Sequence, residues 1–175
     1  MVIPLVLLVA AAATASSLTP PSLVHLRGAS PRETAVLRDL VARSATARTL
    51  AGQIESEAVI VYVEIKTSMP RGRGATRLAA ITPLARFIRI TLAPVAHPDD
   101  LAALVAHELQ HALEIARAPD VTGSDDVRRL YRSIGEDQAA TAAFETVAAQ
   151  EVGARVRQEL SRALSKGSRA EKSSP

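Results

Sequence analysis

The stretch Leu101-Ala-Ala-Leu-Val-Ala-His-Glu-Leu-Gln-His-Ala-Leu113 decides how the rest of this sequence is interpreted. It is apolar except at His107, Glu108, Gln110 and His111. Residues four apart share one face of a helix, so a helix here places the two histidines side by side. Polar side chains embedded in an apolar helix need partners, because burying them unpaired costs several kcal/mol. A shared metal ion is the partner that two histidines at this spacing indicate.

The segment fits the pattern His-Glu-x-x-His, in which two imidazoles bind one zinc ion with Zn–N distances of about 2.0–2.1 Å. Glu108 follows the first ligand directly, and we predict that it acts as a general base toward water at the metal. The alternative is a pair of surface histidines, or of hydrogen-bonded core histidines, on an ordinary amphipathic helix. We favour the metal, because two of the four histidines in the chain occur here, in an uncharged setting.

With this motif the chain resembles the zincin metallopeptidases, and among them the gluzincins, over roughly residues 33–166 in the order of its elements. The resemblance implies a short sheet, a helix that carries the motif, and a later helix that supplies a glutamate as third ligand. The longer pattern with a third histidine is lacking, because Arg117 and Ala118 stand where that histidine region falls. The third ligand is therefore expected farther along the chain.

Two glutamates are candidates for the third ligand, and both fall in the helix predicted over residues 136–166. Glu145 projects into the middle of the apolar stripe of that helix, whereas Glu151 projects toward its edge. A carboxylate inside an apolar stripe needs a cation or donors, so Glu145 is the first choice and Glu151 the alternative. Tyr131 is a weaker candidate for stabilising an oxyanion, and packing of its own helix is the competing interpretation.

The rest of the chain predicts an α+β domain with a helix before a short three-stranded sheet and two helices, one short and one long, after the motif helix. Residues 58–65 are β-branched and apolar, which is typical of a buried strand. The expected elements are, in order, a helix at 33–57, strands at 58–65, 75–81 and 87–92, and helices ending near 117, at 125–134 and at 136–166.

The first fifteen residues are an apolar run followed by Ala13-Thr14-Ala15, which is typical of a secretory signal peptide. We predict an exported protein, periplasmic or secreted, with no stable membrane span once the signal is removed. The chain has no cysteine, so disulfides cannot contribute to its stability. The predicted division is a signal peptide at 1–15, a linker at 16–32, the zincin-like domain at 33–167 and a disordered tail at 168–175.

The leading hypothesis is a zinc-dependent peptidase whose partners are peptide or protein substrates. The formal charge of +3 is small and spread along the chain, which argues against nucleic acid as a partner. The second hypothesis is a non-catalytic exported domain that binds zinc structurally, or that uses a zincin scaffold for protein interaction. The small size of the chain favours this alternative, since little sequence remains to build a substrate cleft.

Overall fold

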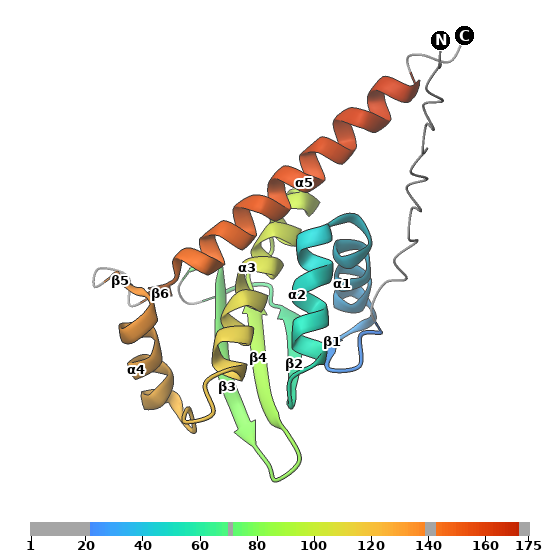
Figure 1. The fold of residues 1–175 in the computed structure, drawn as a ribbon. Helices are drawn as coiled ribbons and strands as arrows, with labels where there is room; N and C mark the ends of the chain where they lie inside the picture. Colours follow the sequence, from blue (N-terminus) through green and yellow to red (C-terminus); the bar gives the residue numbers. More distant parts are fainter. Residues whose placement is uncertain (1–21, 70–71, 139–142, 172–175) are drawn as a thin grey trace, which may run out of the picture.

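The fold is α+β and is built around one mixed sheet, shown in the computed structural model of Figure 1. The structure describes residues 22–69, 72–138 and 143–171. The sheet has four strands, which are β1 (Leu26–Gly28), β2 (Val59–Ile65), β3 (Gly74–Ile81) and β4 (Arg86–Leu92). Their order is β1-β2-β4-β3, with β1, β2 and β4 parallel and β3 antiparallel to β4. Strand β3 therefore forms one edge of the sheet.

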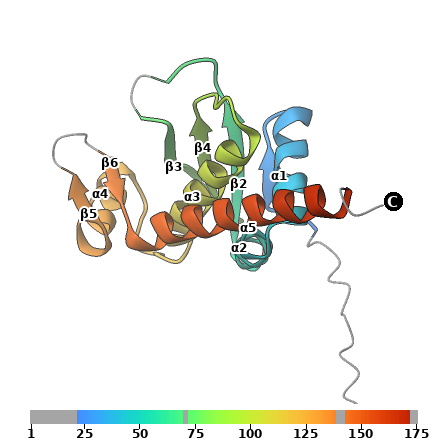
Figure 2. The ribbon, with the colours of Figure 1, turned by 90° about the horizontal axis from the view of Figure 1, so that it is seen from above.

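Five helices accompany the sheet within the described residues. They are α1 (Pro31–Arg43), α2 (Ala45–Glu55), α3 (Pro98–Ala116), α4 (Ser124–Ile134) and α5 (Val147–Glu171). A small antiparallel pair, β5 (Glu136–Gln138) and β6 (Ala143–Glu145), connects α4 to α5. Helix α3 contacts β2, β3 and β4, and α5 packs along α3, as the view from above in Figure 2 also shows.

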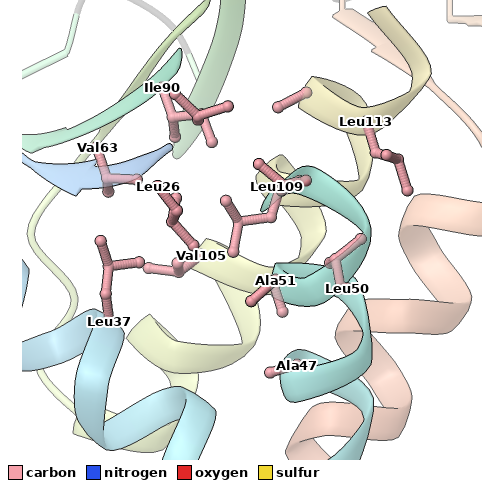
Figure 3. Packing of buried hydrophobic residues seen from close by; sticks show 14 of the residues in the cluster. Leu26, Leu37, Ala47, Leu50, Ala51, Val63, Ile90, Val105, Leu109 and Leu113 are labelled. Atoms are coloured by element: carbon pink, nitrogen blue, oxygen red, sulfur yellow. The ribbon is translucent and has the colours of Figure 1, made fainter. Parts of the chain in front are cut away.

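The main core lies between one face of the sheet and helices α1, α2 and α3. Alternate strand residues such as Val63 and Ile90 are buried, and they pack against Leu37, Val105 and Leu109 of the helices (Figure 3). Each such aliphatic side chain stabilises the fold by about 1.5–3 kcal/mol on burial. Because a slip of one residue turns these side chains outward, this pattern holds the register of the strands.

The single helix predicted over residues 33–57 is wrong, because Ser44 divides it into α1 and α2. Ser44 has extended backbone angles (φ −116°, ψ 123°), and its N–H still donates to the Leu40 carbonyl that ends α1. Its hydroxyl accepts from the Ala47 N–H at 3.0 Å and so caps α2. Serine serves well as an N-cap, and here its capping role outweighs the continuous apolar periodicity.

The helix predicted over 136–166 is wrong at its start and too short at its end. Residues on either side of the gap at 139–142 form β5 and β6, and α5 begins only at Val147. The hydroxyl of Thr146 accepts from the Ala149 N–H at 3.1 Å, which makes Thr146 the N-cap of α5. Helix α5 then continues to Glu171, so residues 168–171 are helical rather than a disordered tail.

The N-terminal part of the chain also differs from expectation. The predicted linker at 16–32 contains β1 and the start of α1 within its described residues, so the expected three-stranded sheet has a fourth strand. Strand β1 is buried at Leu26 and pairs with β2. The predicted signal peptide at 1–15 lies outside the described residues. Among the helices that the structure describes, none has both the length and the apolar character needed to cross a bilayer.

Candidate metal centre

Helix α3 presents His107 and His111 on one face, as the sequence predicted. The helix begins at Pro98 and is capped by His97, whose Nδ1 accepts from the Asp99 N–H at 3.3 Å. Proline at the first helical position and acids in the first turn favour this start. One turn separates the two histidines, and their rings lie edge to face with centroids 4.9 Å apart. His111 is buried and His107 is partly buried.

Glu145, the last residue of β6, completes a cluster of three potential ligands. One ligand atom from each of His107, His111 and Glu145 can be chosen so that all three lie within 4.8 Å of one another. His107 Nε2 lies 3.3 Å from Glu145 Oε2. Glu145 was predicted on a helical stripe, but it reaches the cluster from a strand instead. The interpretation of its local structure was therefore wrong, although the residue does face the two histidines.

Three observations on the cluster are compatible with a zinc ion. Two ligands of a tetrahedral zinc with bonds of about 2.0–2.1 Å lie about 3.3 Å apart, which matches the separation between His107 and Glu145. The Oε2 atom of Glu145 is buried and accepts no hydrogen bond, although His107 Nε2 lies 3.3 Å away. A buried carboxylate oxygen without a hydrogen bond is costly, and a cation at this point would offset that cost. Two imidazoles and one carboxylate are also a donor set that zinc prefers.

Glu114 orients His111, one of the three potential ligands. The Nδ1 of His111 donates to Glu114 Oε2 at 2.9 Å, which leaves Nε2 for a metal. Burial raises the pKa of Glu114, but hydrogen bonds from His111 and Thr146 outweigh it and hold the pKa below its ordinary value. Burial lowers the pKa of His111, and the bond to Glu114 reverses this to a net increase. The pair thus fixes both the orientation and the tautomer of the ligand.

Thr146 links this pair to the segment that carries Glu145, the third potential ligand. Its hydroxyl donates to Glu114 Oε1 at 2.7 Å while it caps α5. Because Thr146 directly follows Glu145, one carboxylate holds both the ring of His111 and the backbone next to Glu145. A continuous set of hydrogen bonds therefore joins the two halves of the metal centre.

Glu108 lies beside the cluster, between α3 and the edge strand β3. The Thr76 hydroxyl donates to Glu108 Oε2 at 2.7 Å. The Glu108 carboxylate lies directly against Gly74 and fills the space that a β-carbon at position 74 would need. Burial raises the pKa of Glu108, although the bond from Thr76 and the nearby histidines oppose the increase. A carboxylate held at this position, next to the three potential ligands, is suited to taking up and releasing a proton.

Two glycines lie against the site, and one of them permits a close approach of two backbone segments. A β-carbon on Gly135 would lie 2.7 Å from the Glu145 carbonyl oxygen and 2.8 Å from that of Tyr131. A β-carbon on Gly153 would lie 3.4 Å from Cβ of His107. The glycine at 135 thus lets β6 lie against the end of α4, whereas at 153 a β-carbon would meet His107 at an ordinary contact distance.

Tyr131 and Glu151 occupy different positions relative to the cluster. Tyr131 is buried, its hydroxyl donates to the His111 carbonyl at 3.2 Å, and its ring meets the His111 ring edge to face at 5.3 Å. Burial raises its pKa. It therefore packs against the turn of α3 that carries a ligand. Glu151 is exposed on α5 and does not join the three-residue cluster.

Sequence reasoning missed Glu114, Thr146 and Thr76. Glu114 had a usable signal, because it is an acid three residues after His111 on the same apolar helix and so faces the same side. Thr146 and Thr76 had none, because their roles depend on where α5 starts and on how β3 lies against α3.

Comparisons with protein-family models, with curated proteins and with solved structures found no match to this chain. The resemblance to the gluzincins stays a prediction, and we infer function from the side chains that converge at the site.

Proposed function

We propose that this chain is a zinc-dependent peptidase, with His107, His111 and Glu145 as metal ligands and Glu108 as general base. The observation that carries the proposal is the placement of the Glu108 carboxylate next to three converging ligand side chains. A purely structural zinc site does not need a buried acid of this kind beside its ligands.

Each side chain has a distinct task in this proposal. The two histidines and Glu145 would hold the zinc, which would supply Lewis-acid chemistry by activating water and polarising a carbonyl group. Glu108 takes a proton from the attacking water and delivers it to the amine that leaves. Thr76 holds one carboxylate oxygen of Glu108 in place for both transfers. Glu114 keeps His111 in the orientation that binding requires.

The edge strand β3 supplies a surface for an extended substrate. It pairs only with β4 among the described strands, so the N–H and C=O groups along its other edge have no strand partner. Thr76, the third residue of β3, contacts Glu108, so a peptide aligned along this edge would pass close to the candidate metal centre. Backbone hydrogen bonds to a free edge give affinity without demanding a particular sequence.

The test is turnover of fluorescein-labelled casein by zinc-loaded protein, together with zinc affinity from chelator competition. We expect Glu108→Gln to lower turnover by about a hundredfold or more while zinc affinity stays within threefold of the parent. Glu145→Gln should weaken zinc binding by on the order of a hundredfold. The matched change Glu151→Gln, on the exposed face of α5, should alter neither quantity.

Two results would count against these assignments. Undiminished turnover in Glu108→Gln excludes this glutamate as the general base. A loss of zinc in Glu151→Gln but not in Glu145→Gln reverses the choice of third ligand. Tight binding of one zinc by a parent protein that cleaves neither casein nor a peptide library supports the non-catalytic zinc-binding domain instead.

A further inference from the structure

The face of the sheet that does not line the core carries a row of three arginines. The strand register aligns Arg27 of β1 with Tyr62 of β2, Tyr62 with Arg89 of β4, and Arg89 with Arg77 of β3. All three arginines are exposed and Tyr62 is half-buried. We call these four residues the arginine row. It crosses all four strands, so it spans about 14 Å at the usual strand spacing.

The positive charge of the row is not neutralised. Among the described residues, neither Arg77 nor Arg89 forms an ion pair, although they lie directly opposite each other. Like charges in directly opposed positions destabilise a sheet. Arg27 donates to the Val24 carbonyl and to the Tyr62 hydroxyl and lies over the Tyr62 ring, and none of these groups carries a negative charge.

The charge is confined to a narrow strip. One step along the strands on one side, the same face carries the half-buried apolar residues Ile60 and Phe87. One step on the other side it carries Glu64 and Thr91, and Glu64 lies 3.7 Å from Lys66. The strip is therefore about 7 Å wide, which is the distance between alternate residues of a strand.

We propose that the arginine row binds an extended, acidic segment of a polypeptide partner. Successive side chains on one side of an extended chain are about 7 Å apart, so two or three carboxylates can meet the three guanidinium groups. Each guanidinium can bind a carboxylate through two parallel hydrogen bonds. Apolar side chains of the partner can cover Ile60 and Phe87 beside the row.

The dimensions of the strip favour a polypeptide over the other polyanions. Binding to an anionic membrane usually requires about 4 to 8 clustered basic residues, which is more than this row contains. Nucleic acid binding needs basic residues along a phosphate backbone, whereas here an acid and an apolar pair border the strip. A single row of arginines suits a single row of carboxylates.

The test measures binding of a fluorescein-labelled octaglutamate peptide by fluorescence anisotropy at low salt. We expect the double variant Arg77→Gln with Arg89→Gln to raise the dissociation constant about tenfold or more, which corresponds to the loss of two charge-assisted contacts. The control variant Arg132→Gln with Arg155→Gln removes the same charge from exposed positions on α4 and α5. It should change the dissociation constant by no more than about threefold, the range expected from net charge alone.

A second measurement checks the premise that the opposed arginines repel each other. The variant at Arg77 and Arg89 should melt at a higher temperature than the parent at low salt, and the difference should shrink at high salt. A lower melting temperature contradicts the premise. Equal weakening by both double variants, or no octaglutamate binding by the parent, overturns the proposal. Row-dependent binding that is tighter to phosphatidylglycerol vesicles or to oligo-dT than to octaglutamate also overturns the choice of a polypeptide.

Discussion

Replacing Glu114 by glutamine tests the hydrogen bonds behind the metal centre while keeping the shape of the side chain. The carboxylate accepts on both oxygens, from His111 at 2.9 Å on one and from Thr146 at 2.7 Å and Gln110 at 3.3 Å on the other. A glutamine has only one acceptor oxygen, so one of these two sides must lose its bond. The loss of a charge-assisted bond costs about 1.5–3 kcal/mol. Zinc affinity should therefore fall roughly tenfold to a hundredfold, a range also typical of outer-shell changes at metal sites.

The assay is competition with a chromophoric chelator at one fixed pH, with circular dichroism to check that the apoprotein folds. Gln110→Ala is a useful control, since its bond to Glu114 is the longest of the three and should matter less than about threefold at 3.3 Å. Zinc affinity within twofold of the parent in Glu114→Gln would refute the reasoning that this carboxylate positions His111.

Two further predictions concern stability. Gly135→Ala places a β-carbon against the carbonyl oxygens of Glu145 and Tyr131, so it should lower the free energy of unfolding by about 1–3 kcal/mol and weaken zinc binding. In α2, a β-carbon at Gly52 meets nothing within 4 Å, so Gly52→Ala should raise the free energy of unfolding by about 0.5–1 kcal/mol. Thermal unfolding measures both changes, and equal effects of the two would contradict the steric argument. Glu159 accepts hydrogen bonds from Ser44 and Thr46, and although burial raises its pKa, these bonds outweigh burial and lower it. A lowered folded-state pKa contributes stability above the unfolded pKa, and this is lost as pH falls through the folded value. Glu159→Gln should thus lower the free energy of unfolding by about 1–2 kcal/mol at pH 7 after allowing for solvent screening. In denaturant titrations, the difference in this free energy between variant and parent should disappear below about pH 4. A difference that does not change with pH would show that the ionised form of Glu159 does not stabilise the fold.

The sequence was most informative where a single local period decides the geometry. The spacing of His107 and His111 within an apolar helix predicted their shared face, and α3 confirms it. The strands at β2, β3 and β4 were also expected within a residue or two, because β-branched alternating segments leave few alternatives. The α+β class followed from the order of these elements.

The sequence was least informative where contacts are formed between distant segments. Thr146 ends a strand pair and starts a helix, and no period across residues 136–166 reveals that boundary. The position of Glu145 was argued from a helical stripe that does not exist there. Only the argument that its carboxylate needs a cation or hydrogen-bond donors led to the residue that does face the two histidines. The arginine row depends on the pairing of four strands, three of them parallel and one antiparallel, and the local sequence pattern does not predict which strands pair.

The path of the chain between α3 and β6 has a thermodynamic consequence. Glu114 and Thr146 are 32 residues apart, and the proposed ligands His111 and Glu145, close to them in the sequence, enclose α4 and the β5–β6 pair in one loop. A zinc ion shared by His111 and Glu145 would close that loop as a cross-link does, and closing a loop of this length restricts the unfolded chain by about 3–4 kcal/mol. In a chain without cysteine, such an ion would act as the cross-link that a disulfide provides in other proteins. Its removal by a chelator would free α4 and the adjoining strand pair from this constraint.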